Sequence, residues 1–490
     1  MTTQQPTQQS LTGRSLKAAA WSVLGRGGSE ALKLVSSLIL TRLLFPEAFG
    51  LMATGISIMI MVQLFTDTGT RLSIIQNPRG REPEFLDTAW MIAVMRGIGL
   101  GIILALMAWP MGRFFGKAEL TPLIMLLAIT PVLAGCENPG MALVIRDMKG
   151  QRQVFYDLIP QIGGFICTVS LAFITRSVWS LAIGAVCVSA LKLAASYLVD
   201  SYRPHLRWNS EAGREMIRFG TFIILNSLIS WSATNLDRFF IGKMINMETL
   251  GIFSIGLNIG AALETFCIQI LGNSFFPAIS TVAGDLKRSV RVFSKASSTI
   301  MALAAPLLVT LALFSNEVMS MLYDTRYAGS GAVLFWISLR GMPHIISIIE
   351  CSTLFAFGLP RLETIAMGAR LVALVVLLPL GIMHSGIKGA LLVLLAISLI
   401  PPVIEAIGLK RALGFPVLPL VIPWLQAVIV SGVAFAAHAL LRPYLGGARW
   451  QSLPHLAATL AIAASVSLLM WRLAMKNVDV AYSHIQGAEQ

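Results

Sequence analysis

Residues 88–111 read TAWMIAVMRGIGLGIILALMAWPM, an apolar stretch interrupted by one charged residue, Arg96. A membrane core about 30 Å thick is crossed by roughly 20 helical residues. Only helices and closed barrels satisfy their backbone hydrogen bonds in lipid, and this stretch is too long and too continuously apolar for a barrel strand. It therefore predicts a transmembrane helix.

Similar apolar stretches occupy most of the remaining sequence, and the segments between them are short. A hydrophobic fraction of 56% with only 12% charged residues is far from the composition of a soluble domain. The fold class expected is an all-α polytopic membrane protein with about 14 transmembrane helices. The predicted spans are residues 18–41, 49–75, 88–111, 121–145, 154–175, 178–199, 217–242, 249–276, 296–322, 331–357, 364–383, 387–408, 419–441 and 453–474.

The net charge of +13 does not indicate nucleic-acid binding, because the basic residues are scattered over many loops instead of forming one basic face. Lys and Arg are enriched in the short cytoplasmic loops of membrane proteins. If the N-terminus is cytoplasmic, the predicted cytoplasmic segments carry about twice as many Lys and Arg residues as the opposite side. We therefore predict that both termini are cytoplasmic.

An internal repeat links two parts of the chain. RLLFPEAFGLMATG at residues 42–55 aligns without a gap on KMINMETLGIFSIG at residues 243–256. Each copy joins two predicted spans, and the copies are six spans apart. An even spacing predicts two six-helix lobes that enter the membrane in the same direction, related by a pseudo-two-fold axis along the membrane normal.

This repeat defines the predicted domain organisation. The predicted parts of the chain are a cytoplasmic tail at 1–17, an N-terminal lobe at 18–200, a cytoplasmic linker at 201–216, a C-terminal lobe at 217–408, two additional helices at 419–474 and a cytoplasmic tail at 475–490.

Charged residues inside predicted spans are the candidate functional residues, because each ion costs at least about 2.5 kcal/mol at the centre of a bilayer. In the first span Arg26, Glu30 and Lys33 follow each other by four and three residues, so they share one helix face. Such a stripe needs either a wet cavity or ionic partners on another helix. Both interpretations stay open from the sequence.

Further charges lie in later spans. Asp237 and Arg238 are in the seventh span, Glu264 is in the eighth and Arg340 is in the tenth. Because basic residues outnumber acidic ones inside the spans, a cavity lined by them would favour an anion. Other charges are near predicted span ends, where their side chains can extend toward the lipid headgroups: Asp67, Arg71, Arg96, Lys192 and Arg370.

His344 follows Arg340 by one helical turn, so it can relay protons or bond to a backbone carbonyl. The five cysteines lie inside apolar segments without metal-ligand or redox spacing. The sequence predicts neither a metal site nor a cofactor.

The segment LTRLLFPEAFGLMA at 40–53, with QLFTDTG at 63–69 and EFLDTAW at 84–90, resembles the opening of bacterial Wzx-type polysaccharide flippases. NLDRFFIGKM at 235–244 is similar to the second-half motif of that family. The resemblance covers the first three spans well and the seventh and eighth moderately. It implies the multidrug/oligosaccharidyl-lipid/polysaccharide (MOP) exporter fold, with two lobes around a central cavity in a bacterial inner membrane.

The resemblance also implies a function and site residues. The substrate would be an undecaprenyl-pyrophosphate-linked oligosaccharide, moved to the periplasmic leaflet by alternating access for exopolysaccharide or O-antigen synthesis. Arg26, Lys33, Arg238 and Arg340 are then candidates for binding the pyrophosphate. Glu30, Asp237 and Glu264 are candidates for neutralising these cations or for carrying a coupling ion. A polysaccharide polymerase and a chain-length regulator are implied as partners.

Five other functions remain as alternatives. A lipid II flippase handles the same pyrophosphate group, whereas a multidrug antiporter usually carries cations, which a cationic cavity would repel. A membrane glycosyltransferase or O-antigen polymerase would need large outer loops, but the predicted outer loops are short. A passive scaffold would not need buried charges. We therefore expect a transporter and not an enzyme.

Overall fold

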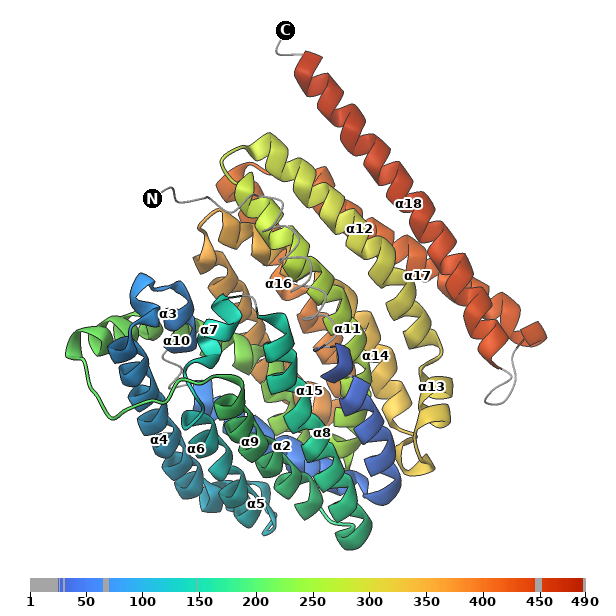
Figure 1. The fold of residues 1–490 in the computed structure, drawn as a ribbon. Helices are drawn as coiled ribbons and strands as arrows, with labels where there is room; N and C mark the ends of the chain where they lie inside the picture. Colours follow the sequence, from blue (N-terminus) through green and yellow to red (C-terminus); the bar gives the residue numbers. More distant parts are fainter. Residues whose placement is uncertain are drawn as a thin grey trace, which may run out of the picture. The chain divides into compact units, whose positions relative to one another are not determined.

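The computed structural model describes residues 25–487 except residues 26, 30, 65–69, 148 and 446–451. Every regular element in these residues is a helix (Figure 1). Residues 31–43 are helical. The later elements are α2 (Pro46–Leu64), α3 (Thr70–Gln76), η1 (Pro78–Arg81), α4 (Pro83–Phe115), α5 (Leu120–Leu127), α6 (Ile129–Gly135), α7 (Met141–Arg146), α8 (Gly150–Thr175), α9 (Trp179–Val199), α10 (Ser210–Met244), α11 (Met247–Thr281), α12 (Leu286–Leu313), α13 (Ser315–Leu322), η2 (Thr325–Tyr327), α14 (Ser330–Ala356), α15 (Pro360–Ser398), α16 (Ile400–Leu413), α17 (Val417–Leu445) and α18 (Leu453–Gly487).

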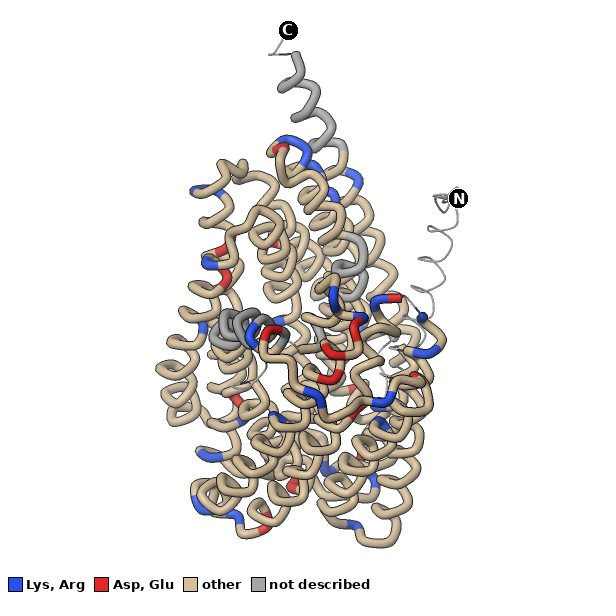
Figure 2. Tube along the Cα trace, turned by 60° about the vertical axis from the view of Figure 1, so that its left-hand side comes forward, with Lys and Arg blue, Asp and Glu red and all other residues tan. Residues whose placement is uncertain are grey.

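The all-α polytopic class is confirmed, and most of the helix length carries no charged residue (Figure 2). Within the described residues, 10 helical segments are long and apolar enough to cross a membrane, compared with the 14 predicted spans. The predicted span 18–41 lies partly outside the description, and 217–242 falls in α10. Residues 121–145 fall in three short helices, of which α6 and α7 are separated by a stretch that contains Pro139 and Gly140.

The last difference in number concerns residues 360–413, which count as one continuous apolar segment by length and composition, whereas the sequence predicts two spans, 364–383 and 387–408. The backbone of this segment turns inside α15, at Ser385 and Gly386, where the φ of Gly386 is 58°. After the turn, a Cβ atom built on Gly389 would lie 1.9 Å from the carbonyl oxygen of Gly381. The segment is therefore a helical hairpin whose two arms touch through glycine backbones, and its turn lies between the two predicted spans.

The two copies of the repeat have the same local structure. The helix at 31–43 ends before a two-residue turn and α2 begins at Pro46, while α10 ends at Met244 and α11 begins at Met247. Gly55 of α2 packs against Leu127 of α5, and the equivalent Gly256 of α11 packs against Val333 of α14. In each copy, the glycine therefore allows close approach of a helix that lies two predicted spans further along the chain.

The chain divides into two compact units, residues 1–243 and 244–490. α10 belongs to the first unit in this division, although the predicted C-terminal lobe begins at residue 217. The pseudo-two-fold axis, the linker at 201–216 and the additional pair at 419–474 remain predictions.

In the first unit, the segment after α9 is attached to the helices by polar contacts. Asp87 of α4 is buried, and its Oδ1 accepts hydrogen bonds from the hydroxyl of Tyr202 at 2.6 Å and the backbone N–H of His205 at 2.8 Å. The Nδ2 of Asn138 donates to the carbonyl of Tyr202 at 2.8 Å. Burial and the adjacent Asp87 raise the pKa of Tyr202, so its hydroxyl stays a donor.

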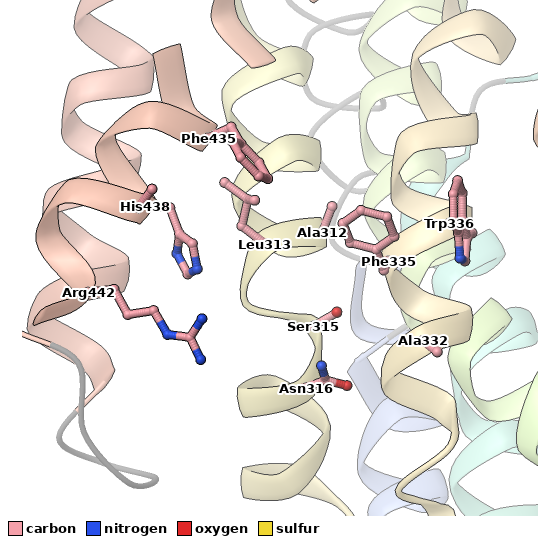
Figure 3. Close-up of a pocket in the computed structure, with 11 residues that line it drawn as sticks. Ala312, Leu313, Ser315, Asn316, Ala332, Phe335, Trp336, Phe435, His438 and Arg442 are labelled. Carbon is pink, nitrogen blue, oxygen red and sulfur yellow. The ribbon is translucent and has the colours of Figure 1, made fainter. Parts of the chain in front are cut away.

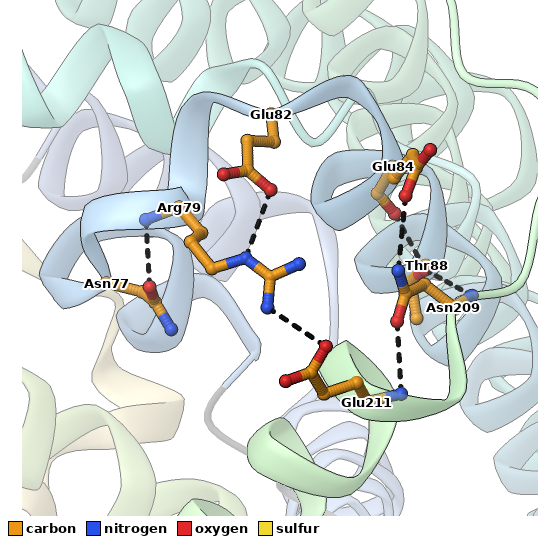
Figure 4. Close-up of polar contacts among 7 residues, drawn as sticks. All are labelled: Asn77, Arg79, Glu82, Glu84, Thr88, Asn209 and Glu211. Atoms are coloured by element: carbon orange, nitrogen blue, oxygen red, sulfur yellow. Dashed lines mark hydrogen bonds and ion pairs between the residues drawn. The ribbon is translucent and has the colours of Figure 1, made fainter.

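The start of α10 is held by a second set of contacts (Figure 4). Arg79 of η1 forms ion pairs with Glu82 at 3.1 Å and Glu211 at 3.5 Å. Asn209 donates from Nδ2 to Glu84 at 3.1 Å and from its backbone N–H to the hydroxyl of Thr88 at 3.0 Å. The segment 200–211 is therefore fixed to the first unit at both its ends.

Removing the hydroxyl of Tyr202 should destabilise this attachment. In Tyr202→Phe, the buried Asp87 loses one of its two donors, which lowers the free energy of unfolding by about 1–2 kcal/mol. Thermal unfolding of the purified protein measures the change. His205→Ala is the matched control, because only the backbone N–H of His205 contacts Asp87. Equal stability of Tyr202→Phe and the unsubstituted protein would contradict the assigned role.

The second unit has one large apolar core formed mainly by α11, α12, α14 and α17. Phe293 of α12 packs edge-on against Phe415 at a ring distance of 5.6 Å. α12, α17 and α18 lie side by side (Figure 1). α14 packs against α12 and carries two of the four charged groups described next.

Candidate functional site: a buried charged cluster on three helices

A charged cluster lies inside the second unit. Arg340 and His344 are one turn apart on α14, so they share a helix face. Glu264 of α11 lies against this face, and its Oε1 contacts Nδ1 of His344. Only 5% of the surface of Glu264 is exposed. A carboxylate buried this deeply needs a partner, and His344 supplies it.

Arg370 of α15 completes the cluster and is also only 5% exposed. The charges of both Arg340 and Arg370 act on the carboxylate of Glu264. Arg340 is half-buried, so its guanidinium is the more accessible of the two. With two guanidinium groups, one carboxylate and one imidazole, the cluster carries excess positive charge and suits an anion.

The pair of Glu264 and His344 should be energetically coupled. Glu264→Gln and His344→Gln each leave one polar partner buried without its counterpart, so each should lower the free energy of unfolding. The double substitution removes both groups, so its cost should be smaller than the sum of the single costs, by about 1–3 kcal/mol. Thermal unfolding of the four proteins measures this difference. Additive costs would show that the two side chains do not interact.

The structure brings together two of the predicted site residues, Glu264 and Arg340. Asp237 and Arg238 are neighbours on α10, in the first unit. Asp237 is 2% exposed and its Oδ1 accepts from the backbone N–H of Arg238 at 2.8 Å. Lys33 has an exposed side chain on the helix at 31–43. Arg26 and Glu30 lie outside the described residues.

Several residues were not predicted correctly. Arg370 was expected to extend toward the headgroups, but it is buried beside Glu264. Three buried carboxylates were not predicted at all: Glu350, Glu363 and Glu405. The signal for two of them was visible, since Glu350 and Glu405 fall inside the predicted spans 331–357 and 387–408.

A pocket of about 440 Å³ lies elsewhere in the second unit, between α12, α13, α14 and α17 (Figure 3). Phe335 and Phe435 form part of its apolar wall, and Asn316, His438 and Arg442 contribute polar atoms. None of the predicted site residues lines this pocket. It is therefore distinct from the charged cluster.

Comparison with known proteins identifies the family. The family model described as polysaccharide biosynthesis protein matches residues 39–332. The chain is 22% identical over 343 residues to the lipopolysaccharide biosynthesis protein WzxC of Escherichia coli (strain K12), covering 68% of each protein. It is 22% identical over 354 residues to the succinoglycan biosynthesis transport protein ExoT of Rhizobium meliloti (strain 1021), covering 71% of this chain and 69% of the relative.

Solved structures identify the fold. The lipid II flippase MurJ in an inward closed conformation matches with a TM-score of 0.69 and 12% identity, over 96% of this chain and 99% of that one. An inward-facing MATE family transporter of the MOP superfamily matches with a TM-score of 0.60 and 14% identity, over 77% of this chain and 92% of that one. ExoT is named as a transport protein, and the two solved structures are a flippase and a transporter and not enzymes, which confirms the non-enzymatic prediction. Because the family match spans more than half of its length, the chain belongs to the polysaccharide biosynthesis protein family, on the fold shared by the MOP superfamily transporters.

Proposed function

We propose that this protein moves an undecaprenyl-pyrophosphate-linked oligosaccharide repeat unit from the cytoplasmic to the periplasmic leaflet of a bacterial inner membrane. The product would supply exopolysaccharide or O-antigen synthesis. Relatives named for lipopolysaccharide and succinoglycan biosynthesis support the substrate class. Both termini are cytoplasmic in this proposal, and the chain has 14 spans in two six-helix lobes with two additional helices.

The observation that carries the proposal is the cationic cluster on α14 and α15. A pyrophosphate is anionic and presents several acceptor oxygens, which match the planar fork of a guanidinium. Arg340 is half-buried and binds the phosphate oxygens. Arg370 adds a second positive charge, and the carboxylate of Glu264, held by His344, interacts with the charges of both arginines. The lipid tail stays in the bilayer during transport.

Residues on the first unit have supporting roles in this proposal. Arg26, Lys33 and Arg238 are further cations for the pyrophosphate. Glu30 and Asp237 neutralise these cations or carry a coupling ion. Alternating access exposes the bound headgroup first to one membrane face and then to the other, without covalent chemistry. A polymerase and a chain-length regulator then act on the delivered repeat unit.

A reconstituted assay tests the substrate class. Liposomes containing the purified protein receive a fluorescently labelled undecaprenyl-pyrophosphate oligosaccharide, and quenching of the outer leaflet measures its movement. We expect movement that requires the protein and that unlabelled lipid-linked oligosaccharide inhibits. Movement of lipid II alone, or of a cationic drug alone, would overturn the proposal in favour of a lipid II flippase or a multidrug antiporter.

A further inference from the structure

Three buried carboxyl groups meet inside the second unit, outside the charged cluster. Glu350 of α14, Glu363 of α15 and Glu405 of α16 are 0%, 7% and 0% exposed. Glu350 lies near the end of α14 and Glu363 near the start of α15. The hairpin brings α16 back to the same end, since Gly408 packs against Leu362. These three residues, called the carboxyl triad, are surrounded by the apolar core of the unit.

The triad lacks enough donors for its oxygens. Ser347 donates from its hydroxyl to Oε2 of Glu405 at 2.8 Å. The side chains of Glu363 and Glu405 lie within hydrogen-bonding range of each other. Oε2 of Glu363 and Oε1 of Glu405 nevertheless have no donor. Two carboxylates are both acceptors, so a contact between them requires a proton.

Glu350 adds an independent observation. Both of its carboxyl oxygens are buried without a hydrogen-bond partner. It lies close enough to Glu405 for its charge to act on that carboxyl group. An ionised Glu350 would therefore be an uncompensated charge next to two further acids, which costs several kcal/mol in an apolar interior. A neutral, protonated Glu350 removes that cost.

The helices packed around the triad provide no basic partner for it among the described residues. The charges that act on Glu405 are those of Glu363 and Glu350, and no charge acts appreciably on Glu350. Cys351 lies beside Glu363. The other titratable groups on α11 to α16 belong to the charged cluster or to other positions. Glu264, Arg340, His344 and Arg370 form the cluster, and Cys267 lies in the core. The rest lie at helix ends or at exposed positions: Glu248, Lys287, Arg288, Arg291, Lys295, Glu317, Arg361, His384, Lys388, Lys410 and Arg411.

The geometry of the triad suits a proton better than a metal ion. Within the part of the chain that the structure describes, no group of three His, Cys, Asp or Glu side chains has the arrangement to hold a metal ion. A proton needs only two facing oxygens, which Glu363 and Glu405 provide. Sharing one proton between two adjacent carboxyl groups is the general solution for acids that cannot both ionise.

We propose that Glu350, Glu363 and Glu405 form a proton-binding site that holds protons while α14, α15 and α16 are packed together and releases one when these helices separate. On separation, water reaches the triad, the O–H bond of the shared proton breaks, the proton passes to water and a hydrated carboxylate remains. Repacking requires that carboxylate to take a proton back from water. Proton exchange is thereby linked to the opening of one end of the second unit.

The helices have the breaks that such an opening needs. Pro343 interrupts the backbone hydrogen bonds of α14 one turn before Ser347. Gly358, with a φ of 73°, forms the turn between α14 and α15. Pro401 and Pro402 start α16 one turn before Glu405. Each carboxyl-bearing segment therefore borders a position where the helix can bend.

Infrared spectroscopy of the purified protein tests proton occupancy without any transport assay. At neutral pH we expect the carbonyl band of protonated, buried carboxyl groups. Glu350→Gln, Glu363→Gln and Glu405→Gln should each reduce it, since a neutral amide replaces a neutral acid of the same shape. Glu264→Gln is the matched control, because Glu264 is equally buried but paired with His344, so the band should be unchanged. Absence of the band in the unsubstituted protein would overturn the proposal. So would an unchanged band in a variant that carries all three substitutions.

A link between this site and transport rests on the proposed function, and liposomes can separate the two. A proton gradient across the liposome membrane is imposed in each direction in turn. In one of the two directions it should accelerate substrate movement by the unsubstituted protein. Glu405→Gln should lose that acceleration while still moving the substrate down the substrate's own concentration gradient. Acceleration that survives in Glu405→Gln would overturn the coupling role. If no substrate moves at all, the proposed function fails, while the infrared result decides proton binding by itself.

Discussion

Arg340→Ala should reduce transport of the lipid-linked oligosaccharide roughly 30-fold or more, because truncating one partner of a charge-assisted contact away from water costs about 2–5 kcal/mol. The guanidinium lies on α14 beside the Glu264–His344 pair, and its removal leaves the carboxylate and the incoming phosphate with one cation fewer. Complementation of a flippase-deficient strain measures polymer production, and an immunoblot of membranes measures abundance.

Two further variants make this result specific. Arg340→Lys keeps the positive charge but loses the planar guanidinium that donates two parallel hydrogen bonds, so we expect partial polymer production. Arg361→Ala removes an exposed cation at the start of α15 and should have no effect. Full polymer production by Arg340→Ala at normal abundance would reject the assignment of Arg340 to the phosphate.

Gly389→Leu should prevent correct folding of the second unit. A Cβ atom at residue 389 would lie 1.9 Å from the carbonyl oxygen of Gly381 and 2.7 Å from its carbonyl carbon. Since the obstacle is backbone, the arms of the hairpin would have to separate, at a cost of about 3 kcal/mol or more. Size-exclusion chromatography of a fluorescent fusion in detergent should show aggregated protein in place of a single peak.

The control for this substitution is on the same helix. A Cβ atom at Gly368 of α15 would meet no atom of another helix within 4 Å, so Gly368→Ala should be tolerated, and alanine favours the helix. A normal elution profile for Gly389→Leu would mean that the two arms do not meet through these glycines.

The features that depend on local sequence could be predicted. The length of apolar stretches such as 88–111 is sufficient to identify membrane helices. The aligned glycines at 55 and 256 predicted equivalent turns, and the structure has the same helix boundaries around both turns. The break between residues 383 and 387 was also predicted, because a histidine, a serine and a glycine separate two apolar runs.

The pairing within the site could not be predicted, since it depends on packing between distant segments. Glu264 and His344 are 80 residues apart, and only the contact between α11 and α14 brings them together. Glu264 was selected because it lies deep in a predicted span. Glu350 and Glu405 were overlooked because a single carboxyl group barely changes the hydropathy of a long apolar segment, although its burial requires a proton or a partner.

The region matched by the family model contains only part of the charged cluster. It ends at residue 332, so it includes Glu264 but not Arg340, His344 or Arg370. The three cluster residues on α14 and α15 therefore lie beyond the region that the family model matches.

The hairpin at Ser385 and Gly386 has a consequence for biosynthesis. The residues around its turn, His384, Ser385 and Lys388, are exposed and polar, so the turn can lie at the membrane surface while both arms are in lipid. Gly381 of the first arm is covered by the backbone of Gly389, which belongs to the second arm. During synthesis the first arm therefore has no complete packing surface until the second arm has followed it from the ribosome.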